Sequence, residues 1–449
     1  SMANSLVTSI INEWALKEGI YVKRIASDRF IAVLNESILG TLENEKFSIL
    51  DTVREKTANI NMSLTLSIGV GVESNSLIEL GQLAQSSLDL VLGRGGDQVA
   101  IKQANGKIRF YGGKTNPVEK RTRVRARVIS HALRDLIQGS DKVFVMGHSH
   151  PDMDAIGASI GVRKMAAMNN VEGYIVVNFE QLNGSVSRLM DELKERSSFY
   201  DSFVSVEEAL SQITPNSLLV IVDTHKPSLV IDERLFSRVD KVVVIDHHRR
   251  GEEFVKNPTL VYMEPYASST AELVTELLEY QPKNDKLTMH ESTALLAGII
   301  VDTKSFTLRT GARTFEAASY LRTNGADTTL VHRLLKEDVH TYVERSKIVQ
   351  TVDFIRPGIA VATGDNYKTY DAVLIAQTAD IILSLKDVSA SFVIANRPDG
   401  LVGISARSLG EINVQMVMEK LGGGGHLTNA ATQIEGHSIE EVKEKLAIA

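Results

Sequence analysis

The chain has 449 residues, of which 43% are hydrophobic and 23% charged, and its formal net charge is -7. This length predicts about three domains, and the acidic balance argues against binding of long nucleic acids, which favours a basic surplus. The absence of cysteine excludes disulfides, zinc–thiolate sites and thiol nucleophiles, so any metal must be held by His and carboxylate. No run of about 18 apolar residues is present, and the opening Ser1-Met2 is typical of an expression remnant, so we expect a soluble fragment.

Helical and strand patterns alternate along the chain, which predicts an α/β protein. In the first hundred residues we expect helices at 3–18, 40–58 and 76–92, and strands at 20–26, 29–35, 63–72 and 97–103. Gly112-Gly113 and Asn116-Pro117 then predict a linker. A basic run from Lys120 to Arg127 is expected to open a helix that continues to Gln138.

The middle section is expected to contain a parallel sheet, because its short apolar runs are typical of strands buried on both faces. These strands are predicted at 142–147, 174–178, 218–223, 241–245 and 260–264. A helical region near 328–350 leads to a last section, with strands at 359–363, 371–376, 391–396 and 401–406 and helices at 411–420 and 438–447. We therefore predict three domains and two linkers, over residues 1–112, 113–128 (linker), 129–325, 326–354 (helical linker) and 355–449.

Four motifs in the middle section combine His, Asp or Lys, and each directly follows an apolar run that we expect to be a strand. They are His148-Ser149-His150-Pro151-Asp152-Met153-Asp154, Asp223-Thr224-His225, Asp246-His247-His248-Arg249 and Asp302-Thr303-Lys304. Because ligands bind beyond the carboxyl ends of parallel strands, these side chains are expected to meet at one edge of the sheet. One such Asp or His alone would more simply cap a helix or lie in the core, but four in the same position favour a shared site.

Several carboxylates close together are costly unless a cation neutralises them, and mixed imidazole and carboxylate ligands suit manganese. Two ions bridged by one carboxylate, roughly 3.5–4 Å apart, would generate hydroxide at neutral pH and clamp phosphate oxygens. The sequence therefore predicts a hydrolase that cleaves a phosphodiester by attack of a metal-activated hydroxide on phosphorus.

The segments HSHPDMD, DTH, DHH and VDTKS resemble the DHH phosphoesterase superfamily, which includes RecJ-like nucleases, oligoribonucleases and type II pyrophosphatases. The resemblance implies a two-metal site with two Mn²⁺, for which Mg²⁺ can substitute. It places His148 and Asp152 on one ion, with Asp154, His247 and Asp302 on the other. It also makes Asp223 the bridging and catalytic carboxylate, and adds three further catalytic residues around the metals, His150, His225 and His248.

The C-terminal section contains Leu421 followed by four glycines and His426, and exposed backbone N–H groups of such a run can bind phosphate. GGGGH resembles the signature of the DHH-associated substrate domain. The resemblance implies that the nucleotide contacts Arg407, Gly422, Gly423, Gly424, Gly425 and His426. The segment EPYASST, residues 264–270, also resembles a family segment near the active site, and Ser268 is our candidate within it.

The segment from Arg24 to Phe30 resembles the RxGGDEF turn of diguanylate cyclases in degenerate form. Ala26 and Ser27 replace the glycine pair, and Arg29 replaces a metal-binding acid, so we expect no cyclase activity. A degenerate GGDEF module followed by the two DHH-type domains resembles the membrane-anchored cyclic di-AMP phosphodiesterases of the GdpP type.

This resemblance implies hydrolysis of cyclic di-AMP to linear 5'-pApA. It also implies a homodimer that acts on cyclic di-AMP and linear dinucleotides rather than long nucleic acid. Membrane attachment, on the cytoplasmic side, would come through a region that precedes this sequence. Two alternatives stay open: an enzyme that degrades nanoRNA or pApA, and a metal-free nucleotide sensor.

Overall fold

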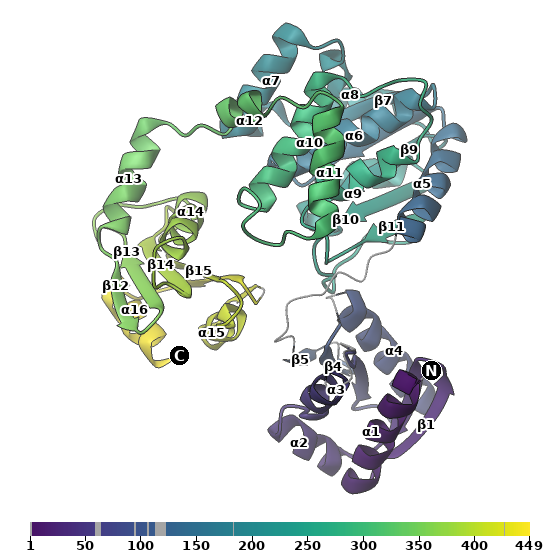
Figure 1. The fold of residues 1–449 in the computed structure, drawn as a ribbon, viewed down its shortest axis with the longest axis vertical. Helices are drawn as coiled ribbons and strands as arrows, with labels where there is room; N and C mark the ends of the chain where they lie inside the picture. The colour runs from purple at the N-terminus through teal and green to yellow at the C-terminus, as the bar shows by residue number, and fades with distance from the viewer. Residues whose placement is uncertain are drawn as a thin grey trace. The chain divides into compact units, whose positions relative to one another are not determined.

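The computed structural model describes residues 2–58, 64–93, 96–105, 107–112, 123–182, 184–425 and 427–449. The chain divides into two compact units, one ending at residue 335 and the other spanning 336–449, and each is described by itself (Figure 1). No helix within these described ranges has both the length and the apolar character needed to cross a membrane.

The N-terminal part of the first unit follows the predicted order of helices and strands with two exceptions. Its elements are α1 (Met2–Glu18), β1 (Tyr21–Ala26), β2 (Arg29–Val33), α2 (Glu36–Asn44), α3 (Ile49–Ala58), β3 (Ile68–Val72), α4 (Leu77–Gly93), β4 (Gln98–Gln103) and β5 (Ile108–Gly112). The single helix predicted at 40–58 is wrong, because Lys46 and Phe47 adopt left-handed φ angles of 55° and 52° between α2 and α3. Strand β5, which pairs with β4, was not predicted.

The middle of the chain forms the predicted parallel sheet. Its strand order is β11-β10-β9-β6-β7-β8, and every neighbouring pair is parallel. The strands are β6 (Lys142–Met146), β7 (Glu172–Val176), β8 (Phe203–Val204), β9 (Leu218–Val222), β10 (Lys241–Asp246) and β11 (Leu260–Met263). The order reverses between β6 and β9, and such a switch point leaves a crevice beyond the strand ends where ligands bind.

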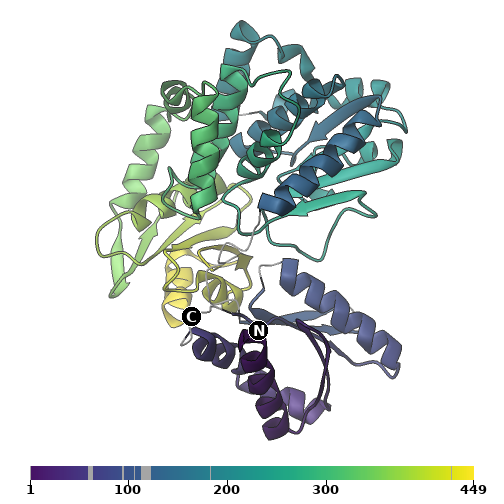
Figure 2. The same ribbon diagram turned by 45° about the vertical axis from the view of Figure 1, so that its right-hand side comes forward.

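Helices cover both faces of this sheet. They are α5 (Arg123–Gln138), α6 (Met153–Met168), α7 (Gly184–Arg196), α8 (Val206–Gln212), α9 (Thr270–Glu279), α10 (Met289–Asp302), α11 (Ala312–Thr323) and α12 (Thr328–Leu334). Short 3-10 helices span Phe179–Gln181, Tyr200–Ser202, Pro227–Leu229 and Glu233–Arg238. Helix α6 is buried nearly all round, because it packs on the strands and is itself covered by α9 and α10. Figure 2 shows the green helices α10 and α11 on the same side of these strands.

One expectation about this sheet is wrong. The apolar run at 298–301, which precedes Asp302, is not a strand but the last turn of α10. The helix starts from a capping box in which Thr288 accepts from the N–H of Glu291 and the Glu291 side chain accepts from the N–H of Thr288. Asp302 therefore reaches the sheet edge from a helix C-terminus.

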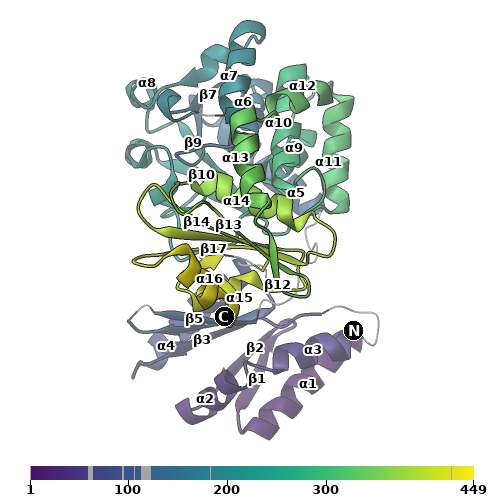
Figure 3. The same cartoon turned by 90° about the vertical axis from the view of Figure 1, so that its left-hand side faces the viewer.

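The second unit is a mixed six-stranded sheet with helices on both faces. Its elements are α13 (Val339–Val349), β12 (Asp353–Arg356), β13 (Ile359–Thr363), α14 (Ala372–Leu383), β14 (Ala390–Asn396), β15 (Val402–Ser408), α15 (Val414–Lys420), β16 (Gly424–Gly425), β17 (Asn429–Ile434) and α16 (Ile439–Ile448). The strand order is β12-β13-β14-β15-β17-β16. Figure 3 shows α14 on one face of this sheet and α15 and α16 on the other.

Two predictions about this region are wrong. The strand predicted at 371–376 is the start of α14, where the Asp371 side chain accepts from the N–H of Leu374 at 2.7 Å. The single helical region predicted near 328–350 is two helices, because α12 ends at Leu334 and Asp338 caps the start of α13.

Candidate metal centre

The strand ends of the parallel sheet carry three of the four predicted motifs. His148 follows β6, and Asp152 caps α6 by accepting the N–H groups of Asp154 and Ala155 at 2.9 and 3.0 Å. Asp223 follows β9 directly and has a φ of 59°, a left-handed value that few residues other than glycine adopt. His247 follows β10, whose last residue is Asp246.

The structure brings the six predicted metal-ligating side chains together in two sets. In one set, His148 Nε2 lies 3.4 Å from Asp223 Oδ2 and 3.9 Å from Asp152 Oδ1. In the other set, His247 Nε2 lies 3.1 Å from Asp302 Oδ2 and 3.7 Å from Asp154 Oδ2. His247 Nε2 also lies 3.4 Å from Asp223 Oδ1, so the two oxygens of Asp223 face different sets. The potential ligand atoms of each set lie within 4.8 Å of one another.

The electrostatics of this cluster fit a divalent cation. Burial raises the pKa of Asp152 to about 6, and the carboxylates of Asp223 and Asp302 add to the effect. The pKa of fully buried Asp154 is raised well above its usual value for the same reasons, burial first. Buried His247 makes no well-aligned hydrogen bond through either ring nitrogen among the described residues, and its Nε2 faces carboxylate oxygens of Asp154, Asp223 and Asp302 at 3.1–3.7 Å. Crowded carboxylates and an unsatisfied imidazole are the donor set that divalent ions take.

Around this cluster, Asp246 orders two of the predicted catalytic histidines. Its Oδ2 lies 2.6 Å from His225 Nδ1, and its Oδ1 lies 2.7 Å from His248 Nδ1. Since the Nε2 of His225 accepts the N–H of Gly251 at 3.1 Å, its Nδ1 carries the proton, and both its nitrogens are engaged within the protein. Burial raises the pKa of Asp246, but His248 and His225 outweigh it and hold that pKa below its usual range.

His248 and His150 differ in their exposure and in their distance from the cluster. His248 is held at Nδ1, its side chain is 44% exposed, and it lies 3.7 Å from Asp223 Oδ1. His150 is exposed, and its Nδ1 lies 3.2 Å from the Oγ of Ser149. Of the three predicted histidines, His248 therefore combines contact with the cluster and access from outside.

Residues at the start of α9 also contact the carboxylates, although they are not among the predicted site residues. The backbone N–H groups of Thr270 and Ala271 donate to Asp154, and the Thr270 hydroxyl donates to Asp223. Ser269 caps this helix by accepting the N–H of Glu272. The S-x-x-E spacing of Ser269 and Glu272 is the signal that could have located this helix start and its free N–H groups.

Ser268, the candidate from the same segment, is fully buried. Its N–H donates to Glu272 Oε2 at 3.0 Å, and its hydroxyl donates to the same oxygen. The Thr314 hydroxyl donates to this carboxylate as well, at 2.8 Å. The Ser268 side chain thus anchors the loop before α9, and its predicted contact with substrate stays a prediction.

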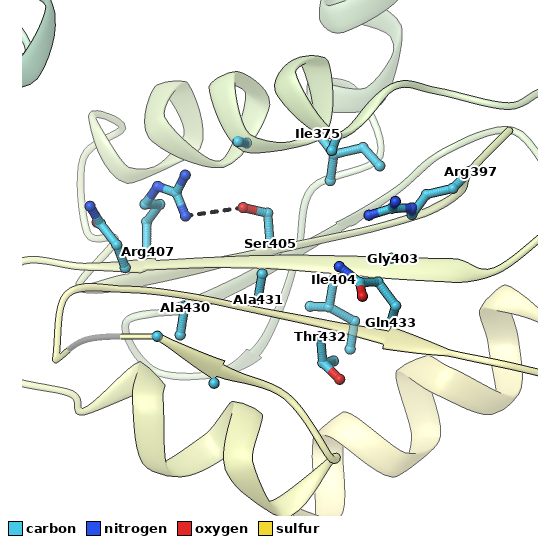
Figure 4. A pocket seen from close by; sticks show the side chains of 15 residues that line it. Ile375, Arg397, Gly403, Ile404, Ser405, Arg407, Ala430, Ala431, Thr432 and Gln433 are labelled. Atoms are coloured by element: carbon cyan, nitrogen blue, oxygen red, sulfur yellow. Dashed lines mark hydrogen bonds between the residues drawn. The ribbon is translucent and has the colours of Figure 1, made fainter. Parts of the chain in front are cut away.

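Three of the predicted substrate residues of the second unit, Arg407, Gly424 and Gly425, line a cavity of about 310 Å³ (Figure 4). Arg407 and Arg397 lie at its two ends with Ser405 between them, and Ile375 of α14 covers it. Arg407 donates from Nε to Asp380 at 2.9 Å and from Nη1 to Ser405 Oγ at 3.0 Å. A guanidinium held in this way is oriented in advance for an anionic or planar ligand.

The glycine run packs against this cavity. Gly424 and Gly425 line it, whereas Gly422 and Gly423 lie just before. A Cβ at Gly423 would lie 2.2 Å from the carbonyl oxygen of Ala431, and one at Gly425 would lie 2.4 Å from Ala430 Cα. These two glycines are therefore required for the close approach of β16 to β17. His426, the last residue of the predicted signature, lies outside the described residues.

Comparison with known families first establishes the class of protein. The model described as "DHH family, N-terminal domain" matches residues 142–299, and the "DHHA1 domain" model matches residues 357–448. In structure, the chain is similar to an exopolyphosphatase-related protein from Bacteroides fragilis, with a TM-score of 0.59 at 18% identity over 72% of this chain and 96% of that one. The fold and the site thus define a DHH–DHHA1 protein.

The N-terminal part of the chain and its close relatives show which family within this class the chain belongs to. Residues 1–110 match the model "Cyclic-di-AMP phosphodiesterase GdpP-like, GGDEF domain". The chain is 63% identical over 446 residues to Cyclic-di-AMP phosphodiesterase GdpP of Geobacillus thermodenitrificans, covering 99% of this chain and 68% of the relative. It is 58% identical over 449 residues to Cyclic-di-AMP phosphodiesterase PdeA of Listeria monocytogenes, covering 100% of this chain and 68% of the relative. The chain belongs to the GdpP-like family of cyclic-di-AMP phosphodiesterases, which confirms the resemblance read from its motifs.

Proposed function

We propose that this chain hydrolyses cyclic di-AMP to linear 5'-pApA at a two-cation centre. The observation that carries the proposal is the pair of His/Asp sets that share Asp223 through its opposite oxygens. The names of the relatives, which are cyclic-di-AMP phosphodiesterases, support this choice of substrate.

Two Mn²⁺ ions, with Mg²⁺ as a substitute, are the cofactors that the side chains favour, since manganese accepts mixed imidazole and carboxylate ligands. His148 and Asp152 would hold one ion, and Asp154, His247 and Asp302 the other, with Asp223 between them. When bound, such a pair lowers the pKa of water and offsets negative charge on phosphate oxygens.

The residues around the centre supply orientation and protons. Asp246 holds His248 at Nδ1, the nitrogen that lies 3.7 Å from Asp223 Oδ1, which leaves Nε2 available to hold a proton. When the P–O3′ bond breaks, the departing O3′ needs a proton, and we assign His248 Nε2 to give it. His225 keeps Asp246 in place, and the exposed His150 would contact the phosphate.

In the second unit, the cavity between Arg407 and Arg397 would hold one nucleotide of the substrate. Its volume of about 310 Å³ is at the lower end of the range for ligand pockets, roughly 300–1,000 Å³. As the resemblance implies, the nucleotide would contact Arg407, the four glycines Gly422, Gly423, Gly424 and Gly425, and His426.

A hydrolysis assay with Mn²⁺ tests the proposal by comparing cyclic di-AMP, cyclic di-GMP and pApA. We expect turnover of cyclic di-AMP to be fastest and to vanish in Asp223→Ala, because that change removes the carboxylate common to both sets. Asp191→Ala on α7, an exposed Asp away from the cluster, is the matched control and should be fully active. Absence of cyclic di-AMP turnover would end the proposal. A higher kcat/KM for pApA would favour the alternative of a nanoRNA-degrading enzyme.

Homodimer formation and membrane attachment through preceding residues belong to the same proposal. The attachment is supported by a relative named "Membrane protein-large ribosomal subunit bL9 fusion protein" from Aster yellows witches'-broom phytoplasma, 36% identical over 95% of this chain and 50% of the relative. Analytical ultracentrifugation tests the dimer, and a monomer at micromolar concentration would contradict it.

A further inference from the structure

Among the described residues, Thr270 is the one that donates hydrogen bonds both to Asp154 and to the shared carboxylate of Asp223. It is fully buried and is the first residue of α9. Its backbone N–H donates to Asp154 Oδ2 at 2.8 Å, and its hydroxyl donates to Asp223 Oδ1 at 3.0 Å. The next N–H, of Ala271, donates to Asp154 Oδ1 at 2.7 Å. A single helix start thus fixes two of the carboxylates on which the proposed cation centre depends.

The backbone half of this contact follows from helix geometry. The first N–H groups of a helix have no partner within the helix, and the helix dipole favours negative charge there. Both oxygens of Asp154 are satisfied in this way, so the carboxylate plane is fixed without any side chain. Substitution of residue 270 leaves these backbone donors in place.

The hydrogen bond from Thr270 to Asp223 depends on the side-chain hydroxyl alone. Asp223 Oδ1 faces His247 at 3.4 Å, whereas Oδ2 faces His148 at the same distance. A carboxylate can rotate about its last bond, and the bond from Thr270 Oγ1 restrains Oδ1 on the His247 side. A serine hydroxyl can restore this bond, and an alanine or valine side chain cannot.

We propose that Thr270 is a positioning residue that holds the Asp223 carboxylate so that each of its oxygens faces a different cation. The inference rests on the proposed function for its effect on catalysis. The quantity that it predicts directly is the affinity of the chain for the metal. Loss of a hydrogen-bond partner behind a metal ligand typically lowers metal affinity or activity by about 10–100-fold.

Titration of the full chain with Mn²⁺ by isothermal calorimetry tests the inference. We expect Thr270→Val and Thr270→Ala to bind Mn²⁺ about 10–100-fold more weakly than the unmodified chain. We expect Thr270→Ser to return to within about threefold of the original affinity. With cyclic di-AMP, kcat should fall while KM changes little, because Thr270 contacts the ligands of the metals and not the nucleotide.

Thr275 provides a matched control on the same helix. It is also a fully buried threonine, and its hydroxyl donates to the carbonyl oxygen of Ala271 at 2.7 Å, not to a carboxylate. Thr275→Val should therefore leave Mn²⁺ affinity unchanged. The Ser and Ala variants at 270 differ by one hydroxyl, so their comparison decides the matter even if the Val variant folds poorly.

The inference is overturned if Thr270→Ala binds Mn²⁺ as tightly as Thr270→Ser. It is also overturned if Thr275→Val weakens binding as much as Thr270→Val, since the effect would then come from packing of α9. If Mn²⁺ affinity follows the hydroxyl but cyclic di-AMP is not hydrolysed, the positioning role stands and the proposed function fails.

Discussion

Gly157 sets how closely α6 approaches α10, and we expect Gly157→Ala to disturb the metal centre through this helix crossing. A Cβ at this position would lie 2.6 Å from the carbonyl oxygen of Ala294 and 3.3 Å from Leu295 Cα. Since nonpolar contacts are most favourable near about 3.5–4 Å, the two helices would have to separate by roughly 1 Å. Helix α6 carries Asp154 and α10 ends at Asp302, so the separation widens one ligand set.

The size of the effect follows from two opposing terms. Added volume in a packed core costs about 1–3 kcal/mol, and replacing glycine by alanine within a helix returns about 0.5–1 kcal/mol. We therefore expect Gly157→Ala to lower the free energy of unfolding by about 0–2.5 kcal/mol and to weaken Mn²⁺ binding.

Differential scanning calorimetry of the metal-free chain measures the first effect, and Mn²⁺ titration the second. Fluorescence of Trp14 would not serve, because this tryptophan lies on α1 in the N-terminal part. Gly40→Ala on α2 is the control: a Cβ there meets no atom within 4 Å, so it should stabilise its own module by about 0.5–1 kcal/mol. Unchanged stability and unchanged Mn²⁺ affinity in Gly157→Ala would refute the reasoning.

Arg29→Glu, on an exposed strand of the N-terminal module, should leave hydrolysis of cyclic di-AMP nearly unchanged; a large loss would show that this module takes part in catalysis. Removal of metal by a chelator should lower the melting temperature and abolish turnover. Adding Mn²⁺ back at 100 times its Kd should restore about 2.7 kcal/mol for each ion bound, and a melting curve indifferent to Mn²⁺ would contradict the two-cation centre. Gly423→Ala should weaken nucleotide binding and destabilise the second unit, because its Cβ would lie 2.2 Å from the carbonyl oxygen of Ala431. Gly424→Ala should leave the stability of the second unit unchanged, because its Cβ would meet no atom within 4 Å.

The part of the site that lies at the ends of strands could be predicted from the sequence. His148, Asp223 and His247 each follow a strand that is buried on both faces, and in a parallel sheet such positions meet at one edge. Identical reasoning placed Asp302 correctly beside the other cluster residues but on the wrong element, because a four-residue apolar run fits a strand and a buried helix equally well. The Thr288–Glu291 capping box, eleven residues before Asp302, was the signal for a helix.

Features that depend on contacts between distant segments could not be predicted. Thr270 lies 47 residues from Asp223 along the chain, and no local pattern shows that its hydroxyl reaches that carboxylate. The hydrogen bonds that hold both ring nitrogens of His225 could not be predicted either, because they come from Asp246 and from the N–H of Gly251. Lys46 and Phe47 adopt left-handed φ angles and divide the helix predicted at 40–58. Neither residue is a glycine, so the sequence does not mark the break.

The backbone at Asp223 links the strain of the fold to the geometry of the centre. A left-handed φ costs a residue with a side chain roughly 1–2 kcal/mol, and glycine would avoid this cost but would supply no carboxylate. The conformation is held because the N–H of Asp223 donates to the carbonyl oxygen of Ile245 at 3.0 Å, which continues the pairing of β9 with β10. The turn at this point directs the side chain between His148 and His247, with Thr270 behind it. The strain therefore lies at the residue whose two oxygens face different histidines, at the centre of the His/Asp cluster.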